Sequence, residues 1–201
     1  MSNKKAFNLR QNSIFVLYNK LNNFKTNIMI TKQNLKVAFF SLTLFIATGL
    51  TGQNKNIVET AATTEDFSTL AAAVSAAELI DVLSSEGPFT VFAPTNEAFN
   101  KLPDGTLESL LKPESKKTLQ TILTYHVLSG NIKAADLIEL INTNNGKAMV
   151  KTVSGNMLTA QLKDGAAYLV DESGNWSMIT ATDVKTTNGV IHVIDSVLLP
   201  K

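Results

Sequence analysis

Residues 87–99 read Gly-Pro-Phe-Thr-Val-Phe-Ala-Pro-Thr-Asn-Glu-Ala-Phe, a stretch that predicts a strand, a turn and the start of a helix. Phe89–Ala93 is an apolar and β-branched run between two prolines, which is typical of a buried strand. Thr95 follows in the position of a helix N-cap, and Glu97 lies in the first turn, where the helix dipole favours a negative charge. Because this strand is too apolar for the edge of a sheet, we expect it to lie inside the sheet that the C-terminal half forms.

A second block of the same kind closes the chain. Residues 188–200 read Asn-Gly-Val-Ile-His-Val-Ile-Asp-Ser-Val-Leu-Leu-Pro. Asn188 and Gly189 suit a turn that needs positive φ, and a strand follows them. Alternation along this strand gives two faces, which are Val190, His192 and Ile194 on one side and Ile191, Val193 and Asp195 on the other.

The segments around these blocks divide into a helical half and a strand-rich half. Asp66 and Asp104 each precede apolar residues at helix spacing, so we expect them to cap helices. Pro113 suits the first position of the longest predicted helix, which ends at Tyr125 and His126. After Asn142, turns separate short strands, expected at Met149–Val153, Met157–Leu162, Ala167–Val170, Met178–Ala181 and Val190–Ile194. Helices followed by hairpins predict one α+β domain.

Three segments of the chain resemble the fasciclin domain family: the two blocks and the Tyr125-His126 pair between them. The resemblance covers about Asn56 to Pro200. It implies a wedge-like β-sandwich of about seven strands with several helices packed on it. It also implies adhesion or matrix association through protein or glycan partners, with no general catalytic activity.

Composition narrows the function classes. The chain has 201 residues, of which 44% are hydrophobic and 17% charged, as in a globular protein. Residues 1–49 contain seven Lys and Arg and no acidic residue, which leaves 11 Lys against 17 acidic residues, a net charge of −6, for the remainder. This Arg-free, acidic remainder argues against a nucleic-acid surface, which needs clustered cations. The absence of Cys excludes disulfides, a thiolate nucleophile and Cys-bound zinc.

The N-terminal segment is typical of an export signal. Val37–Leu50 is an apolar run of 14 residues, shorter than the ~20 that span a bilayer, with lysines before it and small residues after it. We therefore expect residues 1–52 to be an N-terminal extension that contains a secretory signal peptide. Met29 is an alternative start of the protein, because it would give a signal peptide of ordinary length. Residues 53–64 follow as a polar linker, and residues 56–201 form the fasciclin domain. These features predict a secreted or extracellular protein (periplasmic or cell-surface if bacterial) that contacts a membrane only through an uncleaved signal segment.

Five residues are candidates for partner binding. Tyr125 and His126 are expected to form a buried pair whose polar atoms bond backbone groups. A second interpretation is that they lie in a segment that contacts a partner, because the resemblance to animal matrix proteins implies integrin binding near this pair. Metal ligation is a third interpretation. Asp183 and Val184 partly match an Asp-Ile integrin motif of those relatives, or else Asp183 caps a turn and Val184 packs in the core. Trp176, in a polar turn, either anchors a partner or folds back over the sheet.

Catalysis and cofactor binding have little support in the sequence. There is no Gly-x-Ser-x-Gly motif, and alternation places His192 and Asp195 on opposite faces of one strand. Two histidines without cysteine are a weak basis for a metal site, so we expect no metal, no cofactor and no enzyme activity. The sequence favours a secreted, non-catalytic adhesion module that binds a cell-surface or matrix protein or a polysaccharide. The alternative is a carrier of a small hydrophobic ligand in a pocket between helices and sheet.

Overall fold

The computed structural model of this chain describes residues 55–201, so the expected signal peptide and the alternative start at Met29 lie outside the described residues. Seven α-helices are present in this range: α2 (Ile57–Thr63), α3 (Ser68–Ala76), α4 (Ile80–Ser84), α5 (Asn96–Asn100), α6 (Thr106–Leu110), α7 (Lys116–Tyr125) and α8 (Ala134–Thr143). Two short 3₁₀ helices accompany them, η1 (Glu65–Phe67) and η2 (Pro113–Ser115). None of the described helices is long and apolar enough to span a bilayer.

Seven strands form one mixed sheet in the order β2-β1-β7-β6-β5-β4-β3. Their bounds are β1 (Phe89–Pro94), β2 (Val127–Ser129), β3 (Lys147–Lys151), β4 (Met157–Lys163), β5 (Ala166–Val170), β6 (Trp176–Thr186) and β7 (Gly189–Ile194). β1 lies between β2 and β7 and runs parallel to β7, whereas the other neighbours are antiparallel. The predicted internal position of the first strand and the predicted α+β fold are therefore confirmed.

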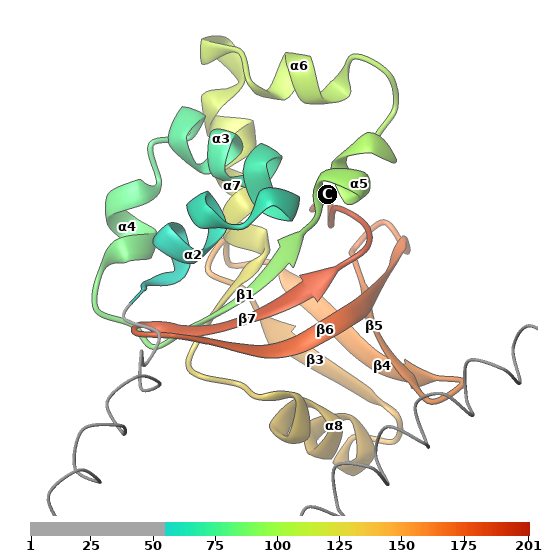
Figure 1. Ribbon diagram of the computed structural model, residues 1–201. Helices are drawn as coiled ribbons and strands as arrows, with labels where there is room; N and C mark the ends of the chain where they lie inside the picture. The colour runs from blue at the N-terminus through green and yellow to red at the C-terminus, as the bar shows by residue number, and fades with distance from the viewer. Residues whose placement is uncertain (1–54) are drawn as a thin grey trace, which may run out of the picture. The chain divides into compact units, whose positions relative to one another are not determined.

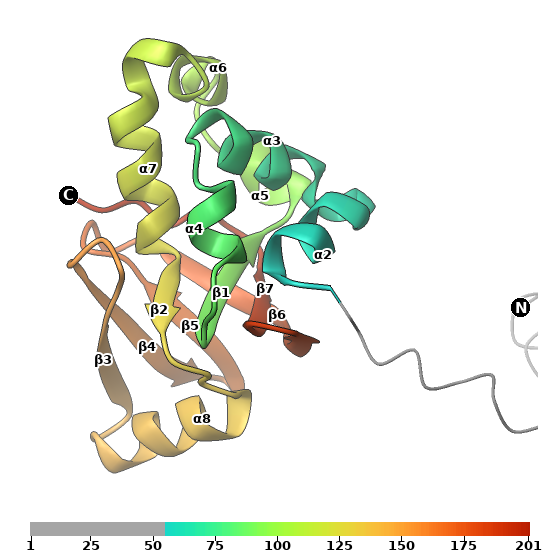
Figure 2. The same cartoon turned by 90° about the vertical axis from the view of Figure 1, so that its left-hand side faces the viewer.

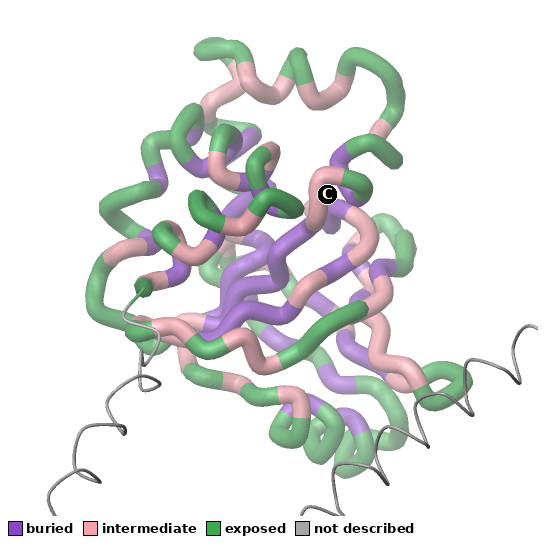
Figure 3. Tube along the Cα trace, viewed as in Figure 1, coloured by how far each residue is buried: buried purple, intermediate pink, exposed green. Residues whose placement is uncertain are grey.

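The helices lie on two sides of β1 and β7. Helices α2 to α7 gather on one side and α8 lies on the other (Figures 1 and 2). Buried segments follow β1 and its neighbours through the centre of the fold, while the helices turn exposed residues outward (Figure 3). This arrangement makes β1 and β7 the central layer of the domain.

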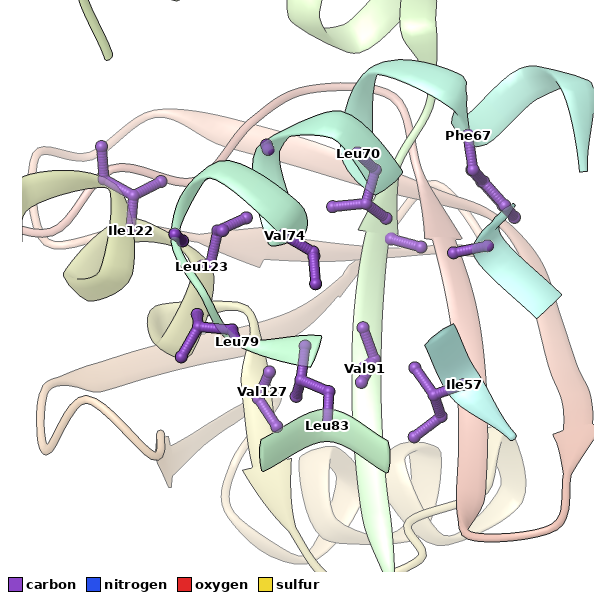
Figure 4. Packing of buried hydrophobic residues seen from close by; sticks show 14 of the residues in the cluster. Ile57, Phe67, Leu70, Val74, Leu79, Leu83, Val91, Ile122, Leu123 and Val127 are labelled. Carbon is purple, nitrogen blue, oxygen red and sulfur yellow. The ribbon is translucent and has the colours of Figure 1, made fainter. Parts of the chain in front are cut away.

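Two hydrophobic cores result, because successive side chains of a strand point to opposite faces. Val91 of β1 and Ile191 of β7 pack with the helices on one side of the sheet. Figure 4 shows Ile57 of α2 and Leu83 of α4 beside Val91, with side chains of α3 and α7 in the same cluster. Phe92 of β1 and Ile194 of β7 point to the opposite face and pack instead with β3, β4, β5 and α8. The second core includes Leu137, Ile141, Ala148, Val150, Leu158, Ala160 and Leu169.

The expected linker at residues 53–64 is wrong, because helix α2 occupies most of it. Asn56 caps this helix by accepting the N–H of Glu59 at 2.9 Å, and the Glu59 carboxylate accepts the N–H of Asn56 at 2.8 Å. This reciprocal capping box closes the first turn. Ile57 and Ala61 bury the inner side of the helix in the first core. These two buried residues and the capping box stabilise the helix, although the polar, small-residue composition of the segment is typical of a linker.

Three expected helix starts differ from the structure. Asp66 lies inside η1, and Phe67 is the N-cap of α3. Gly105, not Asp104, precedes α6, since the turn there needs φ of +79°. Pro113 begins η2, which leads into α7 three residues later. By contrast, Thr95 caps α5 as predicted, accepting the Ala98 N–H at 3.2 Å.

The structure has a strand at each of the six predicted places, with different bounds, and one strand more. β6 is the largest difference, since it runs for 11 residues instead of the expected four at Met178–Ala181. Register shifts near Ala181 and Val184 interrupt the alternation of inward and outward side chains along β6. A search for alternating apolar and polar residues therefore finds only part of this strand. β2 was not predicted, because three residues give no period of their own. It exists through its pairing with β1.

The approach of β1 and β7 leads to a prediction about Gly189. A Cβ at this position would lie 2.0 Å from the Phe89 carbonyl oxygen, so the Gly189→Ala variant must push the two strands apart. We expect it to lower the free energy of unfolding by about 3 kcal/mol, measured by urea denaturation. Gly155→Ala is the control: its φ of +93° is strained for Ala but no atom lies within 4 Å, so the expected loss is about 1 kcal/mol. Equal losses in the two variants would contradict the steric explanation.

Candidate interaction surface

Tyr125 and His126 are buried at the end of α7, with exposed fractions of 0% and 2%. The Tyr125 hydroxyl donates to the Met157 carbonyl oxygen at 2.9 Å, and burial raises the pKa of this hydroxyl to about 12. His126 Nδ1 donates to the Ile122 carbonyl oxygen at 2.8 Å, and its Nε2 accepts the Leu198 N–H at 3.0 Å. The buried-pair interpretation therefore describes both residues, and neither side chain is accessible to a partner.

Burial also sets the charge of His126. Both ring nitrogens are engaged with backbone groups, and the backbone N–H of Leu198 requires an unprotonated Nε2 as acceptor. Desolvation lowers the pKa of His126 to about 4, so the ring is neutral at neutral pH. Among the described residues, no group of three or more His, Cys, Asp or Glu side chains is placed to hold a metal ion.

Asp183 has a structural role within β6. Its φ is +58°, and its carboxylate Oδ1 accepts the N–H of Ala134, the first residue of α8, at 3.0 Å. Its own N–H points to His192 Nδ1 at 3.4 Å, and His192 Nε2 bonds the Ile132 carbonyl oxygen at 2.9 Å. Asp183 thus fastens the start of α8 to the sheet. Val184 is half-buried and packs against the first core.

Trp176 combines both of the expected properties. Its ring meets the Tyr168 ring edge to face, with 5.5 Å between the centroids, and Lys163 Nζ lies 5.1 Å from the Trp176 ring centroid. The side chain therefore lies over the sheet, yet 44% of it is exposed. Seven residues of strand, about 23 Å, separate Trp176 from Asp183. The predicted contact residues consequently do not form one site.

Strand register shows what surrounds Trp176. Trp176 pairs with Val170, Val170 with Thr159, and Thr159 with Met149. Paired residues of antiparallel strands point to the same side, so these four form a row across β6, β5, β4 and β3. The adjacent row contains Met178, Tyr168, Gln161 and Lys147. The alternate residues of the same strands point inward to the second core.

We call this side of β3–β6 the outer face. Its residues are Lys147, Met149, Lys151, Met157, Thr159, Gln161, Lys163, Ala166, Tyr168, Val170, Trp176 and Met178. Gln161 in the middle of this face is buried. Met149 is 65% exposed, and Met157 is 36% exposed. No single strand signals this surface in the sequence; only the register brings the exposed methionines next to Trp176.

The outer face differs in charge from the rest of the domain. β3, β4 and β5 contain Lys147, Lys151 and Lys163 and no acidic residue, whereas residues 50–201 as a whole have an excess of acidic residues. The two salt bridges found within residues 55–201 join Lys101 to Asp195 and Lys116 to Glu78, so neither uses an outer-face lysine. Two carboxylates border the face: Glu172 accepts the N–H of Met157 at 3.3 Å, and Asp164 follows Lys163 in the chain. The three lysines therefore leave a small excess of positive charge on this face.

The cavity between the helices and β1 is small. Apolar side chains of α2, α3, α4, α7 and β1 line it, and its volume is about 30 Å³. Pockets for small ligands have volumes of roughly 300–1,000 Å³. As folded, this part of the helix–sheet interface has no room for a hydrophobic ligand, so it does not favour the carrier alternative.

Comparison with known proteins identifies the class. The profile of the family described as Fasciclin domain matches residues 65–200. Protein sll1483 of Synechocystis is 49% identical over 155 residues, which cover 77% of this chain and 79% of that protein. The immunogenic protein MPB70 of Mycobacterium bovis is 37% identical over 155 residues, covering 74% of this chain and 72% of the relative. Human periostin is 35% identical over 136 residues, covering 68% of this chain but 15% of periostin.

A solved structure agrees with the fold. The FAS1 domain pair of the insect cell adhesion molecule Fasciclin I superposes with a TM-score of 0.65 at 19% identity, covering 73% of this chain and 51% of that chain. The chain belongs to the fasciclin domain family, as its two terminal blocks and the Tyr125-His126 pair predict. Fasciclin domains are generally non-catalytic modules that mediate protein interactions.

The buried His126 predicts how stability depends on pH. Its pKa is about 4 in the folded chain and about 6.5 when unfolded, so the unfolded state binds the proton first on acidification. The contribution of His126 is fully present above pH 6.5 and declines between about pH 6.5 and 4. We expect a loss of about 2 kcal/mol between pH 7.5 and 5 in urea denaturation. His126→Gln should have a clearly shallower pH slope, and an unchanged slope in this variant would contradict the assignment.

The contact between Asp183 and α8 predicts a difference between two substitutions. Asp183→Ala removes the acceptor of the Ala134 N–H and places Ala at positive φ, so the free energy of unfolding should fall by about 2 kcal/mol. Asp183→Asn keeps an acceptor oxygen and tolerates this φ, so its loss should be below about 0.5 kcal/mol. Chemical denaturation of both variants checks this. If Asp183→Ala were as stable as the wild type, the residue would have no such structural role.

Proposed function

We propose that this chain is a secreted, non-catalytic adhesion or interaction module that binds a protein or glycan partner at a cell surface or in a matrix through its outer face. The observation that carries the proposal is the exposure of Trp176, Met149 and Met157 on one side of a sheet whose other side is fully packed. Exposed tryptophan beside other apolar side chains is the usual composition of an interaction site. Tyr125 and His126 are left out of this surface because they are buried.

Secretion has support in the sequence. Lysines at positions 32 and 36, the apolar run Val37–Leu50 and the small residues after it have the order of a secretory signal. A cysteine-free domain needs a sizeable core to be stable outside the cell, and the two cores supply one. The insect relative is described as a cell adhesion molecule, which supports an adhesive role here as well.

Removing the Trp176 ring tests the proposal. Trp176→Ala should weaken binding of the labelled full chain to the cells that produce it, or to their extracellular matrix, by about tenfold or more. An aromatic side chain that the partner buries contributes at least about 1.4 kcal/mol to the binding free energy. Binding isotherms measured by flow cytometry check this. Val82→Ala is the control, since Val82 on α4 is 49% exposed and belongs to no strand. Wild-type binding by a folded Trp176→Ala variant would refute the proposed surface.

A further inference from the structure

The lysines of the outer face indicate the chemistry of its partner. We propose that the outer face binds an acidic segment of a polypeptide, whose apolar side chains pack on Met149 and Trp176 while its carboxylates pair with the surrounding lysines. This inference rests on the proposed function, because it needs the outer face to be the binding surface.

The positions of the lysines support a segment with carboxylates on both sides of an apolar anchor. Lys147 and Lys151 are the two ends of β3, about 13 Å apart, and Met149 lies between them on the same face. Lys163 lies on β4, two residues beyond Gln161, which pairs with Lys147. It therefore adds a positive charge on the Lys147 side of the face. Its ammonium group lies near the Trp176 ring and has no salt bridge among the described residues. Lysines thus lie beside both Met149 and Trp176, and the carboxylate of Glu172, which accepts the Met157 N–H, lies near Lys151 alone.

The strip between the lysines has the properties of an interface centre. The row from Met149 to Trp176 crosses three strand spacings, about 14 Å. Methionine is unbranched and adapts its shape to different apolar side chains, and tryptophan is the residue most enriched among energetic anchors. Met149 and Trp176, at the two ends of the row, have exposed fractions of 65% and 44%, far above those of residues inside a packed sheet.

The size of the surface favours a segment over a folded partner. Its apolar strip and bordering lysines occupy roughly 14 by 20 Å, near 280 Å², because six residues separate the levels of Lys151 and Lys163 along β4. A stable complex of two folded proteins buries about 800 Å² on each partner. An extended segment can use this smaller area, because its side chains reach the strip and the lysines at the same time.

The chemistry of the strip favours a polypeptide over a polysaccharide. Thioether, aliphatic and indole carbon atoms dominate the exposed positions Met149, Met157 and Trp176. Apolar side chains gain free energy when they are buried against such atoms. The hydroxyl groups of a carboxylated polysaccharide find no hydrogen-bond partner on the side chains of Met149 and Met157, so burying them there is costly.

Three anionic polymers distinguish these partner classes. The random copolymer of glutamate and tyrosine supplies carboxylates and apolar anchors, poly-L-glutamate supplies carboxylates alone, and alginate is a carboxylated polysaccharide. Binding of each to the full chain is measured by biolayer interferometry in about 50 mM and about 500 mM NaCl. We expect the copolymer to bind about tenfold more tightly than either of the other two, and to weaken about tenfold or more at the higher salt concentration.

Charge reversal localises the interaction. The double variant Lys147→Glu/Lys151→Glu should bind the copolymer about tenfold or more weakly than the wild type. Lys112→Glu/Lys117→Glu changes the net charge equally, but in the helical half near η2 and α7, and it should bind like the wild type. Circular dichroism establishes that both double variants are folded.

The outcomes separate this inference from the proposed function. Equal affinities for alginate and copolymer, equal losses in the two double variants, or no binding of the copolymer would each overturn the acidic polypeptide as partner. If Trp176→Ala weakens cell binding but Lys147→Glu/Lys151→Glu does not, the outer face remains the binding surface and only the partner chemistry is wrong. If neither variant alters cell binding, the proposed function fails as well.

Discussion

The close parallel pairing of β1 with β7 is the constraint on which the rest of the domain depends. Gly87 and Gly189 allow it, because a Cβ at either position would lie 2.0 Å from a backbone oxygen of the other block. Asn188 strengthens this pairing and joins two more segments, α2 and α4. Its backbone carbonyl oxygen accepts the Phe89 N–H, its side-chain oxygen accepts the Ile57 N–H, and its side-chain nitrogen donates to the end of α4. Helix positions and strand pairing are consequently fixed by one small region.

This pairing also determines where a binding surface can form. β1 and β7 contribute one face to the helical core and the other to the second core, so both of their faces are covered. β3, β4 and β5 contribute only their inner face to the second core, on the side where α8 packs. Their outer face has exposed residues such as Met149 and Trp176. The position of the candidate surface thus follows from the topology, and its chemistry follows from the residues at alternate positions.

The sequence predicts the elements whose signal is local. The strand Phe89–Ala93 is recognisable from its composition, and Thr95 from its place before a helix. The capping box of α2, formed by Asn56 and Glu59, was also present in the sequence, but a small-residue composition concealed it. The outer face could not be predicted in this way. Its existence depends on which strands are neighbours, on their register and on which face the helices cover, and none of these properties is local.

The two terminal blocks and the Tyr125-His126 pair identify the family but lie mostly in the interior. Changes there affect packing, as at His126, whose neutral ring bonds backbone groups on both sides. Outer-face positions are under a different constraint, since only their alternate neighbours form the core. A lysine, methionine or tryptophan there can be exchanged with little effect on the fold, because its side chain is partly in solvent. Partner chemistry can therefore vary on this face while the fold stays the same, which is why family membership alone does not specify what this domain binds.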